Sequence, residues 1–368
     1  MEMSWFEKKL NFDIWLLAAA IILSSFGALM VYSTSSILAM DKFGDQSYYL
    51  KREIVYLMAG FVLMAASMHF NHERLRFFSS LILIIAFAGL IAVFFFSPIR
   101  GAHRWIKFSS FQFQPSELAR LAIVLYFAHS LSKRQEKLNR FLSGIGPYLA
   151  IIALFVILIL AEPDFGGSLS IALLGMVVLF TAGVRLRYLL AASAAGLPIA
   201  LYLLASEEYR WRRLIAFINP WAYSKDYAFQ LVQSFLAFGN GGLFGVGLGM
   251  SHQKLFYLPD AHTDFIFSVI AEEWGWAGVI AVIAVFALFV TRGLIIAFFS
   301  PDRYSCYLAT GITAMIALPA VINMAVVTGL LPTKGLVLPF LSYGGSSLLI
   351  NLTASGILLN ISAKRYQR

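Results

Sequence analysis

The feature that most constrains this chain is a succession of continuous apolar stretches, each about as long as a membrane is thick. A helix that crosses the ~30 Å hydrocarbon core of a bilayer needs about 20 consecutive apolar residues. The 368 residues contain ten such stretches, at residues 14–39, 54–70, 77–97, 115–131, 146–161, 166–183, 188–205, 265–290, 304–331 and 336–361. They are continuously apolar rather than alternating, which favours helices over a membrane barrel. We therefore expect an all-α, polytopic integral membrane protein with ten transmembrane helices, in one membrane domain spanning residues 1–368.

The composition supports this fold class. Hydrophobic residues make up 60% of the chain and charged residues 13%, whereas soluble domains carry about 25% charged residues. A chain with so little charge could not cover a surface in water, so the composition excludes a soluble globular domain, a disordered chain and a coiled coil. The single cysteine, Cys306, excludes an internal disulfide and a cysteine-built metal site.

The distribution of charge orients the predicted helices. Ten crossings place both termini on one side, and the segments on that side carry 15 of the 28 Lys and Arg but only six of the 19 Asp and Glu. The whole net charge of +9 therefore lies on that face, which the positive-inside rule assigns to the cytoplasm. The excess suits anionic lipid headgroups, so membrane lipid is an expected partner and nucleic acid is not.

The longest segment without a predicted crossing covers residues 206–263. Loops longer than about 12–15 residues are usually functional or disordered, and the many aromatic residues of this one argue against disorder. We expect a large, folded, partly embedded extracytoplasmic loop with short helices, between the seventh and eighth crossings. Its glycines at 239–249 suit either a re-entrant turn or a phosphate-cradling loop; no strand precedes them, which favours the turn.

Asp264 lies directly after this loop, at the outer mouth of the eighth predicted crossing. On a helix it shares one face with small residues, namely Ser268, Ala271, Gly275 and Gly278. Such a stripe suits close helix packing, so Asp264 should point inward rather than into lipid. An acid in the first turn is also favoured by the helix dipole, but acids at membrane depth usually line a cavity or are paired. Placement favours a functional role for Asp264 and leaves Glu272 and Glu273 open.

A second polar cluster precedes and opens the fourth predicted crossing. Pro115 fits a first helical position, and Glu117 and Arg120 are three residues apart, on one helical face. The structural interpretation is a helix cap with a local ion pair. The functional interpretation is an acid and a cation presented at the mouth of a cavity. Two further polar groups lie in an exterior turn at residues 162–168 and in a small-residue segment at 341–347. We interpret the second of these segments as helix packing and a kink.

Several common reaction classes find no support in the sequence. The six histidines form no H-E-x-x-H motif or close pair, so a histidine-built zinc site is not expected. The chain contains no G-x-S-x-G elbow and no P-loop. Serine hydrolase chemistry and an ATP-driven pump are therefore unsupported.

These motifs resemble those of the SEDS family (shape, elongation, division and sporulation), which includes FtsW, RodA and SpoVE. The resemblance covers essentially all ten predicted crossings and is most specific over residues 239–273. Three stretches indicate the FtsW branch rather than RodA: Gln253-Lys254, Tyr257-Leu258-Pro259, and Thr333-Lys334-Gly335 ahead of Leu341-Ser342-Tyr343-Gly344-Gly345-Ser346. SpoVE shares much of this pattern and remains an alternative.

The resemblance implies the SEDS fold and a peptidoglycan glycosyltransferase. Such an enzyme polymerises lipid II, a disaccharide-pentapeptide on undecaprenyl pyrophosphate, at the outer face of the bacterial cytoplasmic membrane, here at the division septum. Its implied partners are a class B penicillin-binding protein, which crosslinks the strands, and other divisome proteins. The implied catalytic residues are Asp264, in a His-Thr-Asp motif, and Glu117, in a Gln-Pro-Ser-Glu motif. Arg120 stands where the family usually has lysine, which leaves its role open, and Asp260 stands where FtsW-like chains usually have glutamate.

The expected reaction is attack of a sugar hydroxyl on an anomeric carbon while a pyrophosphate leaves. Asp264 would take the hydroxyl proton as general base, and cations would stabilise the leaving pyrophosphate. The expected substrate-binding residues are Arg104, Arg120, Lys254, His262, Gln233 and Ser346. A divalent cation (Mg or Mn) held by Asp264 or Glu117 is the expected cofactor, and no organic cofactor is expected.

Two alternatives belong to other classes of function. A lipid II flippase would also use ten crossings with buried acids, but it needs no general base. A non-catalytic divisome scaffold would tolerate substitution of Asp264 and Glu117. The acid at an outer cavity mouth favours the enzyme.

Overall fold

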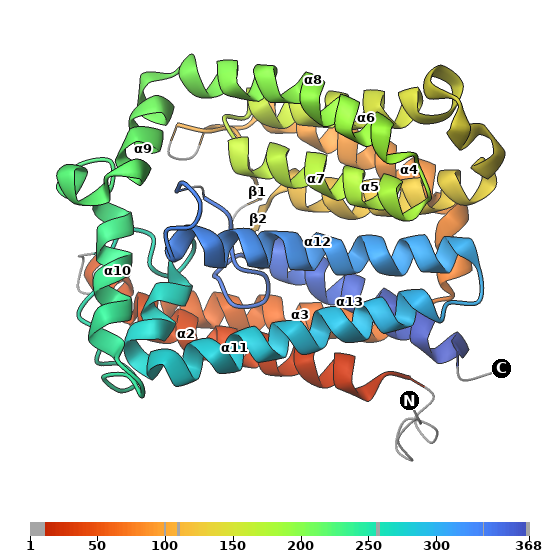
Figure 1. The fold of residues 1–368 in the computed structure, drawn as a ribbon. Helices are drawn as coiled ribbons and strands as arrows, with labels where there is room; N and C mark the ends of the chain where they lie inside the picture. The colour runs from red at the N-terminus through yellow and green to blue at the C-terminus, as the bar shows by residue number, and fades with distance from the viewer. Residues whose placement is uncertain (1–11, 99–100, 109–110, 255–257, 334, 366–368) are drawn as a thin grey trace.

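The computed structural model describes residues 12–98, 101–108, 111–254, 258–333 and 335–365, and this part of the chain is mostly helical (Figure 1). The long helices are α2 (Ile14–Phe43), α3 (Tyr48–His69), α4 (His72–Ala92), α5 (Pro115–Lys133), α6 (Gly146–Ala161), α7 (Phe165–Thr181), α8 (Leu186–Ala205), α11 (Ile266–Phe298), α12 (Arg303–Val327) and α13 (Gly345–Arg365). Short helical turns are η1 (Val93–Phe95), η2 (Gln135–Asn139) and η3 (Phe141–Ile145). The segment between α8 and α11 contains α9 (Glu208–Ile218), η4 (Pro220–Tyr223) and α10 (Phe229–Gly241).

Six helical segments among the described residues are long and apolar enough to cross a membrane. They are Ile14–Phe43, His72–Phe95, Ser143–Ala161, Ile266–Phe298, Arg303–Val327 and Gly345–Lys364. The other four predicted stretches overlap α3, α5, α7 and α8. The structure therefore confirms a membrane protein built from apolar helices.

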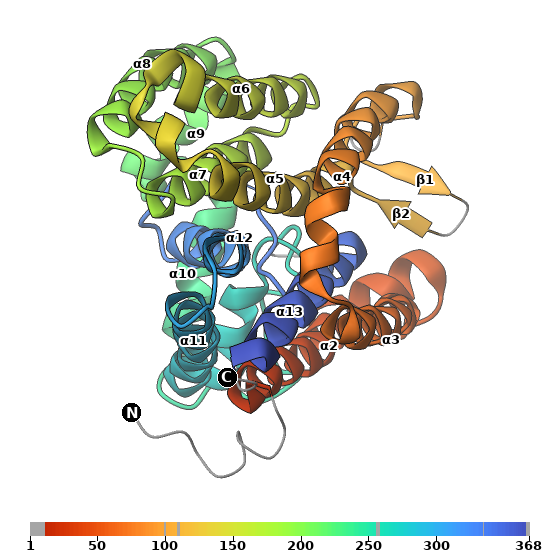
Figure 2. The same cartoon turned by 90° about the vertical axis from the view of Figure 1, so that its right-hand side faces the viewer.

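The helices form one bundle around α5, α12 and α13. Helix α13 packs along α3, α11 packs against α2 and α12, and α5 contacts α4, α7 and α12. The end-on view in Figure 2 shows α8 on the outside of this arrangement. The start of α2 and the end of α13 lie at one end of the molecule, whereas α9 and α10 lie at the opposite end (Figure 1).

A buried ion pair joins three helices at the end where α2 begins. Asp13 caps α2 by accepting a hydrogen bond from the Leu16 N–H at 3.0 Å. The same carboxylate pairs with Arg292 of α11 at 2.6 Å, and the Asp13 N–H donates to the Ser362 hydroxyl of α13 at 3.0 Å. Because α11 and α13 come late in the chain, these contacts fix the first helix against the last part of the fold.

Helix α11 is broken at Gly275, whose φ of 65° and ψ of −164° are not helical. The break leaves backbone N–H and C=O groups without partners inside the helix. The glycine loop after α10, residues 242–247, forms hydrogen bonds with these groups. Val246 and Gly247 donate to the carbonyls of Glu272 and Glu273 at 3.0 and 3.1 Å, while Trp276 and Ala277 donate to the carbonyls of Gly242 and Leu243, both at 3.0 Å. A Cβ at Gly245 would lie 2.1 Å from the Glu273 carbonyl oxygen. The glycines thus allow close backbone packing, which fits the turn interpretation.

Two features differ from the predicted all-α arrangement. A short antiparallel hairpin, β1 (Ile106–Phe108) and β2 (Phe111–Phe113), precedes α5. The tenth predicted stretch begins at residue 336, but α13 begins only at Gly345. Residues 335–344 are apolar yet irregular: the Tyr343 N–H and the Ser342 hydroxyl donate to the carbonyls of His262 and Thr263, in the loop before α11.

Candidate functional site

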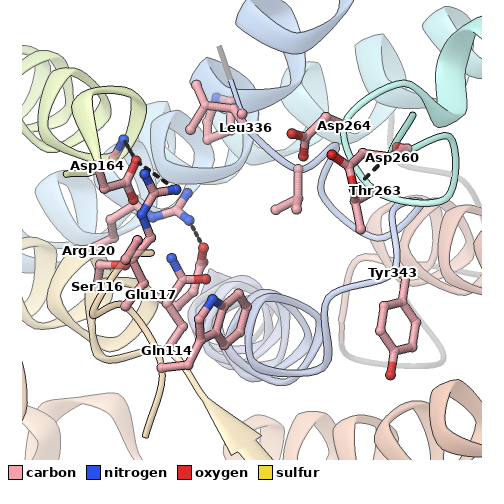
Figure 3. A pocket seen from close by; sticks show the side chains of 17 residues that line it. Gln114, Ser116, Glu117, Arg120, Asp164, Asp260, Thr263, Asp264, Leu336 and Tyr343 are labelled. Carbon is pink, nitrogen blue, oxygen red and sulfur yellow. Dashed lines mark hydrogen bonds and ion pairs between the residues drawn. The ribbon is translucent and has the colours of Figure 1, made fainter. Parts of the chain in front are cut away.

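A cavity of about 280 Å³ lies among the polar segments that the sequence singles out (Figure 3). Its walls come from the hairpin region, the start of α5, the turn between α6 and α7, the loop before α11 and the connector before α13. The lining residues are Ala102, Arg104, Trp105, Gln114, Ser116, Glu117, Arg120, Asp164, Gly167, Asp260, Thr263, Asp264, Pro319, Gly335, Leu336, Val337 and Tyr343. Of the eight predicted site residues, the structure brings four together here: Asp264, Glu117, Arg104 and Arg120.

One wall of the cavity holds the predicted ion pair. Pro115 occupies the first turn of α5, and Glu117 and Arg120 follow on the face toward the cavity. The Arg120 guanidinium donates to Glu117 Oε1, and both residues are buried, with 7% and 3% exposed. Each charge is compensated by the other, which is how a charged pair is tolerated with so little water around it. The local ion pair of the structural interpretation is present, and both of its members line the cavity.

Asp164 adds a second acid to the same side of the cavity. Its carboxylate caps α7 by accepting from the Gly167 N–H at 3.0 Å. Arg104 lies beside it, with Nη1 3.9 Å from Asp164 Oδ1 and Nε donating to the Glu162 carbonyl at 3.3 Å. The cap and the contacts with carbonyl oxygens fix the orientation of both side chains.

Asp264 lies across the cavity from Glu117, Arg120 and Asp164, together with Asp260 and Thr263 (Figure 3). These three residues belong to one tight turn, in which the Asp260 carbonyl accepts from the Asp264 and Thr263 N–H groups at 3.1 and 3.0 Å. Gly335 packs directly against the acid, because a Cβ there would lie 3.0 Å from Asp264 Oδ2. The glycine of the Thr-Lys-Gly motif thereby allows the connector to approach the carboxylate.

The main chain of this turn is held by three consecutive hydrogen bonds from the C-terminal part of the protein. The His262 carbonyl accepts from the Tyr343 N–H at 2.9 Å. The Thr263 carbonyl accepts from the Ser342 hydroxyl at 2.5 Å, and the Asp264 carbonyl accepts from the Asn323 amide at 2.8 Å. The position of Asp264 is therefore set by α12 and by the connector before α13.

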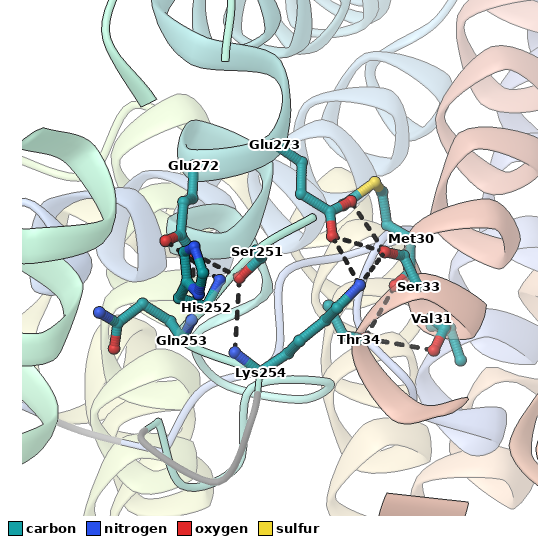
Figure 4. Close-up of polar contacts among 10 residues, drawn as sticks. All are labelled: Met30, Val31, Ser33, Thr34, Ser251, His252, Gln253, Lys254, Glu272 and Glu273. Carbon is teal, nitrogen blue, oxygen red and sulfur yellow. Dashed lines mark hydrogen bonds and ion pairs between the residues drawn. The ribbon is translucent and has the colours of Figure 1, made fainter. Parts of the chain in front are cut away.

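Lys254 lies outside the cavity lining, although the sequence predicts that it binds substrate. Its ammonium is buried and paired with Glu273 Oε1 at 3.1 Å, and the Ser33 hydroxyl contacts the two carboxylate oxygens at 2.7 and 2.8 Å (Figure 4). The adjacent Glu272 accepts from the Ser251 hydroxyl and from the backbone N–H groups of residues 252 and 253. Both glutamates thus bind the loop that precedes Asp264.

The remaining predicted substrate-binding residues also lie outside the cavity lining. His262 is buried, with its ring centroid 5.0 Å from that of Tyr49 and 6.0 Å from that of Tyr343. The Ser346 hydroxyl accepts from the Gln114 N–H at 3.0 Å and donates to the Gln112 carbonyl at 3.1 Å, which ties α13 to β2. Gln233 is half-buried on α10.

The site includes two residues that the sequence-based site prediction did not include: Asp164 lines the cavity, and Asn323 binds the Asp264 main chain from outside the cavity lining. From the sequence, Asp164 could be assigned only to an exterior turn. Its position before Gly166-Gly167 was the one feature that indicated a helix cap. Asn323 gave no signal, because a single asparagine within an apolar stretch does not reveal which carbonyls it meets.

Glu162 lies behind the Arg104 contact and is fully buried. Neither of its carboxyl oxygens has a hydrogen-bond partner among the described residues. Burial, with a smaller contribution from the nearby Asp164 charge, raises the pKa of Glu162 to about 8, while Arg104 acts in the opposite direction. This side chain is thus largely protonated at neutral pH, next to a cavity that contains ionised groups.

The arrangement suits chemistry on an anionic, hydroxyl-bearing substrate. A carboxylate within reach of a hydroxyl can accept its proton, and fixed guanidinium groups can stabilise negative charge that develops nearby. The cavity supplies a carboxylate and a guanidinium group on opposite walls, and these side chains come from different elements.

Comparison with known proteins places the chain in a family. A family model described as a cell cycle protein, covering FtsW, RodA and SpoVE, matches residues 14–367. The probable peptidoglycan glycosyltransferase FtsW of Geobacter sp. (strain M18) is 46% identical over 357 residues, which cover 96% of this chain and 97% of that protein. Stage V sporulation protein E of Bacillus subtilis (strain 168) is 38% identical, with coverage of 98% and 99%.

Solved structures share the fold. A chain from a peptidoglycan synthase complex, studied for how polymerization and crosslinking are coordinated, aligns with a TM-score of 0.79 at 26% identity, covering 97% of this chain and 99% of that one. The rod shape determining protein RodA of Thermus thermophilus aligns with a TM-score of 0.70 at 26% identity, covering 97% and 98%. These matches confirm the resemblance that the motifs indicated, and the chain belongs to the FtsW, RodA and SpoVE family of cell cycle proteins.

Proposed function

We propose that this protein is a peptidoglycan glycosyltransferase that polymerises lipid II into glycan strands during cell division. The observation that carries the proposal is the placement of Asp264 opposite the Glu117–Arg120 pair in one polar cavity. Relatives that cover nearly the whole chain at 46% and 45% identity bear the name of this activity.

Asp264 is the general base of the proposed reaction. A sugar hydroxyl is a weak nucleophile at neutral pH, and a carboxylate that removes its proton during attack lowers the barrier. The hydroxyl oxygen forms a bond to the anomeric carbon of the second sugar, while the bond from that carbon to the pyrophosphate breaks. A single inverting displacement needs one base, so Glu117 is free to orient Arg120, with which it is paired.

Arg120 and Arg104 are the proposed partners of the leaving pyrophosphate. Both line the cavity, and guanidinium groups bind phosphate oxygens through two parallel hydrogen bonds. Arginine at position 120 supplies a planar fork where a lysine would supply a point charge. The leaving group then needs no proton from an acid.

The proposed cofactor is a divalent cation, Mg²⁺ or Mn²⁺. The described residues contain no group of three or more His, Cys, Asp or Glu arranged to hold a metal. Mg²⁺, however, is usually bound through one or two carboxylates together with substrate phosphates. Asp260 and Asp264 share one cavity wall and would hold the ion when a pyrophosphate is present. A bound ion would neutralise negative charge on the pyrophosphate.

We further propose that all ten long helices cross the bacterial cytoplasmic membrane and that both termini are cytoplasmic. The cavity would then open at the outer face, at the division septum. Two observations support this topology: the start of α2 and the end of α13 share one end of the molecule, and α9 and α10 lie at the other. The cationic segments of the chain fall on the terminal side, as the positive-inside rule requires.

The proposed partner is a class B penicillin-binding protein within the divisome. A polymerase that releases uncrosslinked strands needs a transpeptidase beside it. The structural neighbour with a TM-score of 0.79 comes from a complex in which polymerization and crosslinking are coordinated.

The test is a gel assay of glycan strands made from lipid II by the purified protein, with and without a class B penicillin-binding protein. We expect wild type to produce polymer and Asp264→Asn to produce none while retaining its unfolding temperature. Asp226→Asn, an exposed acid outside the cavity lining, is the matched control and should polymerise like wild type. Full polymerisation by Asp264→Asn would refute the assignment of the base. Transfer of lipid II across liposomes without polymer would favour a flippase, and division supported by Asp264→Asn would favour a scaffold.

A further inference from the structure

Tyr343 places an aromatic ring in a cavity where more than half of the lining residues are charged or polar. It belongs to the connector before α13, and it lies on the same side of the cavity as Thr263 and Asp264 (Figure 3). Trp105 is the other aromatic residue in the described lining, and it comes from the segment before β1. The sequence pattern at 341–347 indicates packing and a kink, which leaves the half-buried Tyr343 ring without an assigned role.

The hydroxyl of Tyr343 is engaged outside the cavity. Figure 3 shows that it points away from Asp264 and Thr263. Arg52, near the start of α3, interacts with this hydroxyl through its charge and a side-chain hydrogen bond. A tyrosine commonly satisfies its hydroxyl in this way when the ring is partly buried. Because its polar end is bound to α3, the part of the side chain that Tyr343 offers to the cavity is the ring.

The ring is also held in a fixed position relative to Asp264. The Tyr343 N–H donates to the His262 carbonyl at 2.9 Å, two residues before the acid. The ring centroid lies 5.1 Å from that of Tyr49, with the ring planes at 86°, and 6.0 Å from that of His262. Edge-to-face pairs at such distances are favourable. The ring and the turn that carries the acid therefore form one rigid unit.

A rigid aromatic ring beside a carboxylate suits a sugar better than a phosphate. The face of an aromatic ring carries negative partial charge, which attracts the polarised C–H bonds on one side of a pyranose and repels the oxygens of a phosphate. The hydroxyl groups at the edge of the same pyranose can meet charged side chains. Ligand sites commonly combine an aromatic surface with a few polar groups that fix the orientation of the ligand.

We propose that the Tyr343 ring is the stacking surface for the sugar whose hydroxyl is activated by Asp264. Contact between the ring and the C–H face of the sugar sets the tilt of the sugar, so that its hydroxyl is directed to the carboxylate. The inference rests on the proposed function and deepens it, because it assigns the attacking sugar to the Tyr343 side of the cavity. The sugar that carries the pyrophosphate then lies toward Glu117 and Arg120, on the other side (Figure 3).

The test detects the contact by NMR and does not require turnover. Protein that is deuterated except at its tyrosine rings, in phosphatidylcholine nanodiscs, is mixed with the lipid-free disaccharide-pentapeptide of lipid II, and the tyrosine protons are saturated selectively. We expect saturation to reach the C–H protons of a sugar ring. Sorbitol, which has hydroxyl groups but no ring, should receive none, and equal transfer to sorbitol would overturn the inference.

Tyr343→Phe tests the assignment without disturbing the ring. In this sample the phenylalanine is deuterated, so transfer to the sugar should vanish while the affinity, measured by titration calorimetry, stays as in wild type. Tyr223→Phe is the matched control, because Tyr223 is 41% exposed on η4 and lies outside the cavity lining; it should retain both transfer and affinity. Transfer that persists in Tyr343→Phe would assign the contact to another tyrosine, and affinity lost in Tyr343→Phe would assign the binding to the hydroxyl. Either result would overturn the inference.

Tyr343→Leu removes the aromatic surface. We expect it to bind the disaccharide-pentapeptide at least about tenfold more weakly, as is typical when a central aromatic contact is truncated, while Tyr223→Leu binds like wild type. Affinity that is unchanged in a folded Tyr343→Leu protein would contradict the proposal. Because no arm depends on polymerisation, failure of this inference and failure of the proposed enzymatic function are separate outcomes.

Discussion

Asn323, near the C-terminal end of α12, holds Asp264 by its main chain: the side-chain amide donates to the Asp264 carbonyl at 2.8 Å. The same amide nitrogen donates to the Leu336 carbonyl at 2.6 Å. One buried asparagine therefore joins the loop that carries the proposed base to the connector that packs against it.

Replacement of Asn323 by alanine should reduce polymerisation more than it reduces stability. The substitution leaves two carbonyls without their donor, at a cost of about 1–3 kcal/mol for each buried group. It also releases Asp264, and a displacement of about 1 Å in a reacting group can lower a rate about 100-fold. We expect kcat in the glycan assay to fall by at least about tenfold, with little change in the lipid II concentration needed for half-maximal rate.

Asn351→Ala is the control for Asn323→Ala. Asn351 is equally buried, but its amide donates to the Ser347 hydroxyl of the same helix at 3.1 Å, whereas the Asn323 amide donates to the main chain at Asp264. Its loss should lower the unfolding temperature and leave the rate of the folded protein unchanged. Equal rates for the two variants would show that Asn323 has no positioning role.

Removal of Lys254 should destabilise the protein without altering the chemistry. Breaking a buried ion pair from one side leaves an uncompensated charge and costs about 3–5 kcal/mol. Lys254→Ala is therefore expected to unfold at a clearly lower temperature, and Lys254→Met combined with Glu273→Gln should recover much of the loss. Lys51→Ala removes an exposed pair with Asp45 and should cost no more than about 1 kcal/mol. A Lys254→Ala protein of normal stability that has lost activity would instead support the sequence-based assignment to pyrophosphate.

Gly245→Ala should prevent the glycine loop from closing on α11. Gly245 has a φ of +79°, and a Cβ there would lie 2.1 Å from the Glu273 carbonyl oxygen. Both features oppose any side chain, so we expect little folded protein in the membrane fraction. Gly239→Ala is the matched control, because a Cβ at Gly239 has nothing within 4 Å and alanine is favoured over glycine in a helix by roughly 0.5–1 kcal/mol. If both variants fold normally, the packing described for Gly245 is incorrect.

Stability should fall as pH rises from about 4.5 to about 8, because of Glu162. Burial raises the pKa of this carboxyl from 4.5 to about 8 in the folded protein. In that interval the folded state retains a proton that the unfolded state releases, so deprotonation favours unfolding. Glu162→Gln should therefore unfold at a higher temperature than wild type at pH 8, and the difference should diminish toward pH 4.5. The exposed Glu136→Gln should follow wild type at every pH; a Glu162→Gln curve parallel to wild type would contradict the prediction.

The helices were predictable because apolar length is a property of sequence alone. The predicted stretches at 14–39 and 146–161 correspond to α2 and α6 with few changes at their ends. The start of α13 was not predictable in the same way. Residues 336–344 form an apolar stretch, but their conformation depends on bonds to His262 and Thr263, which lie about 80 positions away in the chain.

The candidate site was predictable where chemistry and helical spacing coincided, as for Glu117 and Arg120. It was not predictable where a polar residue had two equally plausible neighbours. Lys254 has the charge expected of a phosphate ligand, yet its stem directs the ammonium to Glu273. Ser346 has a hydroxyl suited to a sugar, yet that hydroxyl binds the backbone of the hairpin. In both positions the residue type suits substrate binding. The neighbours in the folded protein determine which group the side chain contacts instead.

The break at Gly275 has a consequence for how this protein tolerates lipid. An interrupted helix would normally offer bare amide and carbonyl groups to hydrocarbon, at several kcal/mol for each group. Here residues 242–247 form hydrogen bonds with four of those groups, so these four are not left without partners in the bilayer. The two halves of α11 can therefore point in different directions, and the half before Gly275 can follow the geometry of Asp264 while the half after it continues as an apolar helix.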